Sequence, residues 1–135
     1  MKKNRVTMFL VIVSVTIIMA GCATTSVGTD DTTVIPGPNE SVIVVKRISV
    51  FTGSAISMKI WVDDVEKASS IRNGQEVRFI ISDGEHMIRA GSTAVDKGKS
   101  VSFSAAGEEI SFFAEPQMGV LAARFKLTQI GKRKI

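Results

Sequence analysis

The chain has 135 residues, a length that suits one domain, and a formal net charge of +4. Its single cysteine, Cys22, excludes an intramolecular disulfide bond. Three of the 17 basic residues, Lys2, Lys3 and Arg5, stand at the start, and without them 14 basic residues face 13 acidic ones. The positive charge therefore does not indicate a nucleic-acid-binding protein, which needs a basic patch on its folded domain.

The first 21 residues have the pattern of a secretion signal. The basic start is followed by an uncharged, mostly apolar run of 13 residues from Met8 to Ala20. That run is too short for a membrane-spanning helix, which takes about 20 residues, and it suits the apolar region of a signal peptide.

The residues Met19, Ala20, Gly21 and Cys22 resemble the lipobox of bacterial lipoproteins. The resemblance implies that signal peptidase II recognises the first three and cleaves before Cys22, whose sulfur has received a diacylglycerol. Met19 stands where leucine is usual and keeps its size and apolarity. Two or three acyl chains anchor a protein stably, whereas one chain binds only marginally. The alternative is an ordinary secretory signal followed by a chance cysteine.

The segments around the folded domain have distinct compositions. Residues 22–40 are rich in Thr, Asp, Gly and Pro without an apolar period, so we expect a lipidated, flexible tether. Asp is absent just after Cys22, which favours the outer membrane where the organism has one. Residues 131–135 are predicted to be a basic, solvated tail, with attraction to anionic lipid as the alternative.

Residues 41–130 show short alternating runs that are typical of β-strands. In the second run, Met58, Ile60 and Val62 share one face and Trp61 lies on the other. The predicted strands cover residues 42–51, 57–63, 76–82, 85–90, 100–105, 109–114 and 120–129. We therefore predict an all-β fold, an antiparallel β-sandwich of about seven strands, with a barrel as the alternative.

The connections between these runs contain turn signals of different strength. Asp83-Gly84 predicts a two-residue hairpin, and Ala106-Gly107 predicts a turn. Residues 63–71 could hold one helical turn or a short strand.

Turn and strand features between residues 45 and 88 resemble a known group of domains. They are Arg47, the Gly53–Ser57 segment, Val62-Asp63-Asp64, Asn73-Gly74 and Gly84-Glu85-His86. They resemble an uncharacterised family of small bacterial lipoprotein β-sandwich domains, similar to PEGA-like and transthyretin-like envelope domains. The resemblance implies a β-sandwich at the cell envelope and no catalytic residues. Asp64 stands where glycine is usual in the family.

Catalytic and metal sites find little support in the sequence. His86 is the only histidine, and Cys–His catalysis is excluded because Cys22 is assigned to the lipid. A zinc site of one histidine and carboxylates would be unusual, so we expect His86 to pack or hydrogen-bond near a sheet edge. Asp63-Asp64 is predicted to be a solvated turn and not a calcium site. Ser100, with the serines that follow it, fits the solvent face of a strand.

The segment Asp96-Lys97-Gly98-Lys99-Ser100 resembles the end of a phosphate-binding P-loop. The motif needs a glycine at position 93, which is Thr93, and it needs a helix to follow, whereas residues 101–104 alternate as a strand. We therefore reject a P-loop and predict a β-turn.

Trp61 is the one candidate ligand-binding residue. On an exposed sheet face it could stack on a sugar or contact a partner protein. The interpretation that the pattern favours is that Trp61 lies under a loop or in a second sheet. Sugar-binding sheets usually show several aromatic residues, and Trp61 stands alone.

These observations predict a membrane-anchored, non-enzymatic lipoprotein of the bacterial cell envelope, an interaction or structural module without cofactor or metal. We expect its partners to be the membrane, through the lipid on Cys22, and an envelope protein or glycan, but not nucleic acid. The alternatives are a module that binds peptidoglycan or another glycan through Trp61, and a small inhibitor of an envelope hydrolase.

Overall fold

The computed structural model describes residues 28–29, 33–118 and 123–135. The predicted signal peptide, the lipobox residues Met19 to Gly21 and the lipidation site Cys22 lie outside the described residues. In the described part of the chain, no helix is long and apolar enough to span a membrane.

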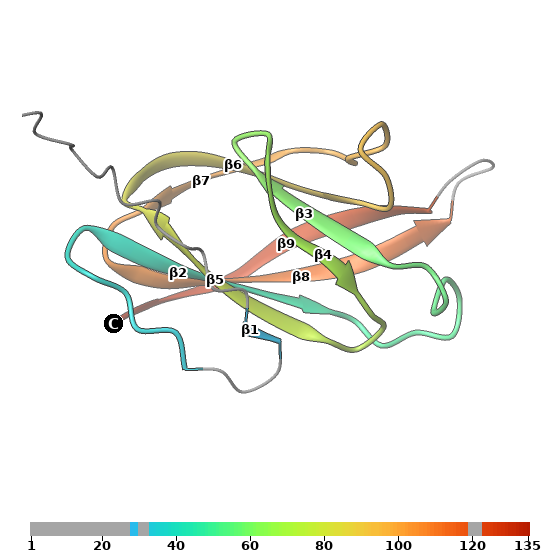
Figure 1. The fold of residues 1–135 in the computed structure, drawn as a ribbon, viewed down its shortest axis with the longest axis horizontal. Helices are drawn as coiled ribbons and strands as arrows, with labels where there is room; N and C mark the ends of the chain where they lie inside the picture. The colour runs from blue at the N-terminus through green and yellow to red at the C-terminus, as the bar shows by residue number, and fades with distance from the viewer. Residues whose placement is uncertain (1–27, 30–32, 119–122) are drawn as a thin grey trace, which may run out of the picture.

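The described residues form nine strands and no helix, so the prediction of an all-β fold is confirmed (Figure 1). The strands are β1 (Gly28–Thr29), β2 (Glu40–Arg47), β3 (Met58–Val62), β4 (Val65–Ile71), β5 (Glu76–Ser82), β6 (Gly84–Gly91), β7 (Val101–Ala105), β8 (Glu108–Met118) and β9 (Ala123–Lys134). Residues 63–71, for which a helical turn was an alternative, form the end of a turn and then β4.

The strands belong to one mixed sheet, which differs from the predicted antiparallel sandwich of about seven strands. Its order is β1-β5-β2-β8-β9-β6-β3-β4, and β7 pairs with β6 beside this path. β2 and β8 are parallel, and the other pairs are antiparallel. Local alternation reveals where strands occur but not which of them pair, so it could not predict this order.

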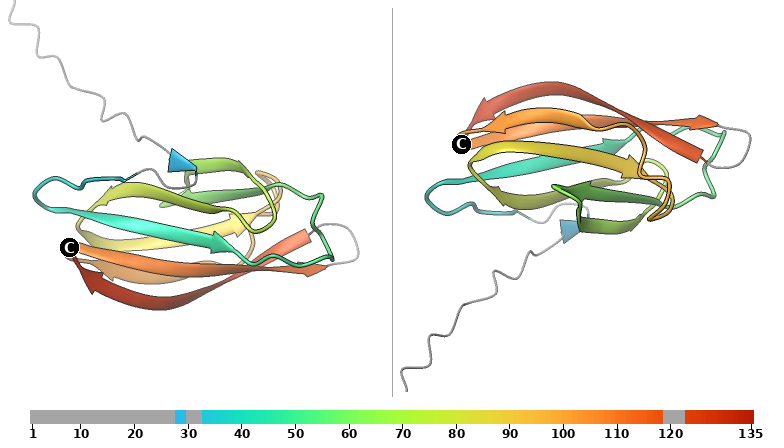
Figure 2. Two further views of the ribbon diagram at one scale, coloured as in Figure 1. Left: turned by 90° about the horizontal axis from the view of Figure 1, so that it is seen from below. Right: turned by 90° about the horizontal axis from the view of Figure 1, so that it is seen from above.

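The sheet folds over on itself, so that one face of every strand from β2 to β9 turns toward a shared interior (Figure 2). The residues of this core alternate along most strands, as the sequence pattern predicted, whereas in β4 they are three positions apart, at Ala68 and Ile71. The core residues are Ile43, Val45, Met58, Ile60, Val62, Ala68, Ile71, Val77, Phe79, Ile81, Ile88, Ala90, Phe103, Ala105, Ile110, Phe112, Ala114, Phe125 and Leu127.

The structure confirms the solvated turn predicted at Asp63-Asp64 but not the hairpin predicted at Asp83-Gly84. Asp63 and Asp64 have φ values of 50° and 64°, and they form the two-residue hairpin between β3 and β4 although Asp64 replaces glycine. Aspartate tolerates this left-handed conformation better than most residues. Asp83-Gly84 was predicted to be a hairpin, but β5 and β6 do not pair there. The chain instead turns a corner from one part of the sheet to another.

The limits of the domain also differ from the predicted ones. Within the predicted tether, Gly28–Thr29 pairs with β5 at Arg78 and Val77. Residues 131–134, predicted to be a tail, continue β9 and pair with the start of β8. They extend the strand because Glu108 and Glu109 of β8 neutralise the facing Lys132 and Arg133 at 3.3 and 3.0 Å.

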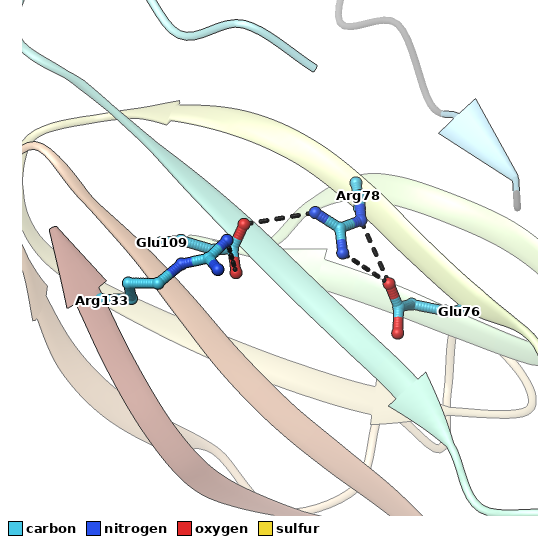
Figure 3. A network of polar contacts seen from close by, with 4 residues as sticks. All are labelled: Glu76, Arg78, Glu109 and Arg133. Carbon is cyan, nitrogen blue, oxygen red and sulfur yellow. Dashed lines mark hydrogen bonds and ion pairs between the residues drawn. The ribbon is translucent and has the colours of Figure 1, made fainter. Parts of the chain in front are cut away.

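Outside the core, a network of charged side chains covers the outer face of β2 (Figure 3). Arg78 contacts Glu76 at 2.9 Å and Glu109 at 3.2 Å, and Glu109 also contacts Arg133. Val44 of β2 pairs with Arg78 in register and is buried. The network balances its own charges, so we assign it a structural role.

Arg47 is the largest fully buried side chain, and it has no carboxylate partner among the described residues. Its guanidinium donates hydrogen bonds to the carbonyl oxygens of Gly53 at 2.7 Å, of Ile71 at 2.8 Å and of Ile56. It also lies over the ring of Phe125 at 5.0 Å. Burial lowers the pKa of Arg47, but an arginine keeps its charge in proteins. Arg47 thus ties the loop of residues 48–57 to the core.

Candidate functional site: a basic groove

A groove of about 1030 Å³ lies where β9 separates from β6. Among the registered pairs, β9 meets β6 only at Arg124 and Gly91, and β7 pairs with the Gly84–Ile88 part of β6. β7 and β9 therefore diverge from this point, and the loop of residues 92–100 that joins β6 to β7 forms one wall of the groove.

Two glycines let the loop of residues 92–100 lie against the sheet. At Gly91, a Cβ atom would overlap the loop backbone, with the Cα atom of Lys97 only 2.8 Å away. At Gly98, φ is +70°, and a Cβ atom would overlap the carbonyl oxygen of Ala90. Because a larger residue would push the loop away, these glycines fix the position of its lysines.

The charged side chains that line the groove are mostly cationic, and we call it the basic groove. Its basic residues are Arg89, Lys97, Lys99, Arg124 and Lys126, and its one carboxylate is Asp96. Five of the 14 basic residues that follow Cys22 thus line one groove, although the chain after Cys22 is almost neutral. Such a concentration of one charge attracts anions.

Only part of this positive charge is neutralised. Asp64, at the β3–β4 turn, lies 3.5 Å from Lys97 and 3.7 Å from Arg89. Asp96 lies 3.4 Å from Arg124. Within the described residues, the exposed Lys99 and Lys126 form no ion pair. They are therefore the groove's best candidates for contact with an anionic partner.

Trp61, the candidate ligand-binding residue, is only 3% exposed, so the prediction of an exposed contact is wrong. Its ring lies beneath the loop of residues 92–100, with the ammonium group of Lys97 at 5.6 Å from its centroid. This is the arrangement that the pattern favoured, a tryptophan under a loop. Trp61 does not line the groove, but it supports a lysine that does.

His86 is placed near a sheet edge and hydrogen-bonds there, as predicted. Its Nδ1 lies 2.6 Å from the Asp63 carboxylate, and its Nε2 lies 2.8 Å from the carbonyl oxygen of Ser82. The hydrogen bond with His86 is the main cause that lowers the pKa of Asp63. Both ring nitrogens are engaged and His86 does not line the basic groove, so it has no free nitrogen to offer a substrate.

Among the described residues, no group of three or more His, Cys, Asp or Glu residues could hold a metal ion. Lysines and arginines hold anions by charge and by their hydrogen-bond donors, and they do not coordinate metals. The groove can therefore bind a carboxylate, a sulfate or a phosphate.

Part of the groove could be recognised from the sequence. The segment from Asp96 to Ser100 drew attention as a P-loop relative, and the structure confirms that a strand, β7, follows it. Lys97 and Lys99 nevertheless line the groove. The sequence reasoning missed Arg124 and Lys126, whose alternation along β9 gave no sign that they face the same loop.

Comparisons of the chain with protein-family models, with curated proteins and with solved structures find no match. What the protein binds must therefore be inferred from the groove and from the pattern of the sequence.

Proposed function

We propose that the protein is a lipid-anchored, non-enzymatic module of the bacterial cell envelope that binds an anionic partner in the basic groove. The observation that supports this most strongly is the gathering of five cationic side chains in one groove of a domain of nearly balanced charge. Only three of them pair with a carboxylate, that of Asp64 or Asp96. An arrangement of like charges costs stability through repulsion, so a partner that neutralises it gains free energy on binding.

The proposed anchor would keep the domain close to a membrane. Five residues lie between Cys22 and Gly28, which pairs with β5, and the six steps along the chain span at most about 20 Å. Two or three acyl chains on Cys22 would make the attachment effectively permanent. We propose the outer membrane where the organism has one, because Asp is absent just after Cys22.

A binding role fits the described side chains better than catalysis. Both nitrogens of His86 are engaged in the fold, and the groove holds cations without an adjacent nucleophile–base pair. The proposal gives Trp61 no contact with peptidoglycan or another glycan, because its side chain is buried.

The proposal includes a relation to small envelope domains of the PEGA-like type and their sandwich architecture. Three features support this: the hairpin at Asp63-Asp64, the hydrogen-bonded His86 after Gly84, and a sheet that folds over a single core.

The proposal is tested in intact cells by photo-crosslinking the full-length chain. One variant has a photoreactive residue at Ala94, which is exposed and lines the groove, and a second has it at Glu85, which is exposed on β6 away from the groove. We expect Ala94 alone to crosslink to an anionic partner. The double variant Lys99→Gln/Lys126→Gln should lose that crosslink. The matched double variant Lys46→Gln/Lys134→Gln, which changes two exposed lysines outside the groove, should keep it.

The anchor is tested in the same cells with labelled palmitate. We expect the label on the wild-type protein and none on Cys22→Ala. A purified protein that keeps residues 1–21, or a Cys22 thiol without acyl mass, would refute the anchor. Equal crosslinks from Ala94 and Glu85, or crosslinks that the groove lysines do not affect, would refute the role of the groove.

A further inference from the structure

Two loops and the end of β8 lie at one end of the sheet, which we call the loop end (Figure 1). β3 begins beside the end of β6, because Lys59 pairs with Gly91. Gly91 in turn pairs with Arg124, near the start of β9. The loop of residues 48–57, the loop of residues 92–100 and the end of β8 therefore lie close together.

The loop end presents large apolar side chains to solvent. Phe51 is 96% exposed, Val95 is 97% exposed and Met118 is 58% exposed. The loop that holds Phe51 touches the end of β8, since a Cβ atom at Gly53 would lie 3.5 Å from the sulfur of Met118. An exposed phenylalanine gains nothing for the fold, whereas burial in a partner or a bilayer would recover its transfer free energy.

The arrangement also fixes how Phe51 is presented. Arg47 binds the carbonyl oxygens of Gly53 and Ile56, so the loop is held from the inside. Asn73 holds the other side of the loop through the backbone N–H and carbonyl groups of Val50, at 3.1 and 2.9 Å. Phe51 therefore projects from a loop that is fastened on both sides.

The basic groove opens at the same end. Val95 is one of its lining residues and lies in the same loop as Lys97 and Lys99. Apolar side chains that project between cations are the combination that binds the surface of an anionic bilayer, where the apolar groups enter the headgroup region and the cations contact phosphates.

We propose that the loop end docks onto an anionic bilayer, with Phe51 and Val95 entering the headgroup region and the basic groove binding lipid phosphates. This inference rests on the proposed function, since it names the membrane itself as the anionic partner. The lipid anchor would make docking intramolecular, so that a weak surface affinity is enough. β1 pairs antiparallel with Val77 and Arg78, close to the start of β5 at the loop end, so the chain before Gly28 leads away from that end. The segment from Cys22 to Gly28, which spans at most about 20 Å, has to turn back for the anchor to share the bilayer with the loop end.

A bilayer explains the observations better than an acidic protein does. A partner that only met the lysines would leave Phe51 in water, because Phe51 lies outside the groove. A bilayer surface is broad enough to contact the loop of residues 48–57 and the groove together, and it supplies both apolar chains and phosphates.

The test places a tryptophan at the loop end of the full-length, acylated protein. Phe51→Trp is reconstituted into phosphatidylcholine vesicles with or without phosphatidylglycerol, using lipids brominated along their acyl chains as quenchers. We expect quenching of the introduced indole in the anionic vesicles only, after subtraction of the wild-type emission from the buried Trp61. Val65→Trp is the matched control, because Val65 is 57% exposed at the opposite end of β3.

Charge variants in the Phe51→Trp background test the groove. Lys99→Gln/Lys126→Gln should lower the docking equilibrium constant by about 30-fold, since each cation near an anionic surface contributes about 1 kcal/mol. Lys46→Gln/Lys134→Gln should leave it unchanged. In the Phe51→Trp protein with an unchanged groove, added salt should reduce the quenching because it screens the same charges.

The outcomes separate this inference from the proposed function. An acylated protein whose introduced indole stays unquenched in anionic vesicles would overturn the docking and leave the anchor intact. Equal quenching of Phe51→Trp and Val65→Trp would also overturn it, as would groove-dependent crosslinks in cells to an acidic protein and none to lipid. A protein without acyl mass on Cys22 would instead refute the proposed function.

Discussion

The two ends of the folded sheet use their polar groups in opposite ways. At the end with the Asp63-Asp64 and Asp83-Gly84 turns, which we call the turn end, side chains satisfy one another. Asp83 accepts hydrogen bonds from the Ser41 hydroxyl at 2.6 Å and from the Gly107 N–H at 2.8 Å. Asp63 similarly binds His86. The polar contacts at the turn end therefore stabilise the fold.

At the loop end, hydrogen bonds hold the loop of residues 48–57 on its inner side, whereas charged and apolar side chains on the outer side have no partner among the described residues. Arg47 holds the loop of residues 48–57 with two carbonyl hydrogen bonds, to Gly53 and to Ile56. In contrast, Lys99 and Lys126 have no ion-pair partner among the described residues. Phe51 projects into solvent. Polar groups of this domain therefore stabilise the fold at the turn end, whereas at the loop end charged groups remain available for a partner.

The largest loss of stability is expected from Arg47→Ala. The substitution leaves the carbonyl oxygens of Gly53, Ile56 and Ile71 without their donor and opens a cavity in the core. We expect the free energy of unfolding to fall by about 4 kcal/mol, measured by urea denaturation. Arg47→Met keeps most of the volume and should lose about half as much. If Arg47→Met were as stable as the wild type, the carbonyl contacts would not fasten the loop end.

A smaller loss is expected at the turn end from Ser41→Ala. The Ser41 hydroxyl is buried, donates to Asp83 and accepts from the N–H of Glu108 at 3.1 Å. Its removal leaves that partly buried N–H without its partner and should lower the free energy of unfolding by about 2 kcal/mol, measured by urea denaturation. Ser82→Ala, on the exposed last residue of β5, is the control and should change stability by less than about 0.5 kcal/mol. Equal losses in both variants would contradict a fastening role for Ser41.

Much of the fold could be predicted from the sequence, because strand positions depend on local alternation. The inward residues of β5 and β8, such as Phe79 and Phe112, follow directly from period-two patterns. The pairing order could not be predicted, since Asp83-Gly84 has the composition of a hairpin turn yet joins two strands that do not pair. The parallel contact of β2 with β8 joins residues more than sixty positions apart, and no local pattern reports it.

The candidate site was harder to predict than the fold. Lys97 and Lys99 occur in a segment that attracted notice for its composition, but Arg124 and Lys126 come from a strand whose register with that loop is a tertiary property. Trp61 is a case between the two. Alternation placed it correctly on the face opposite the core, and of the two coverings that the sequence left open, a loop or a second sheet, the structure has the loop.

The turn end should respond to acid. Hydrogen bonds from His86 chiefly lower the pKa of Asp63, and the Ser41 hydroxyl chiefly lowers that of Asp83. Both carboxylates therefore contribute stability that is fully present above the unfolded-state pKa of about 3.9 and is lost as the pH falls through the lower folded-state values. We expect the free energy of unfolding to decrease below about pH 4 and Asp63→Asn/Asp83→Asn to make that decrease shallower. An unchanged pH profile in the double variant would contradict these contacts.

The smallest change in stability is expected at the basic groove, where the prediction separates a role in folding from a role in binding. Lys99 and Lys126 are exposed and form no ion pair within the described part of the chain, so Lys99→Gln/Lys126→Gln lowers the repulsion within the groove and breaks no ion pair. We expect the free energy of unfolding to stay within about 0.5 kcal/mol of the wild type, or to rise slightly, in urea denaturation. The same variant should lose binding to anionic vesicles. If it unfolded easily, the two lysines would serve the fold, and the loop end would be fastened like the turn end. Retained stability with lost binding would instead show that the domain keeps this positive charge for a partner.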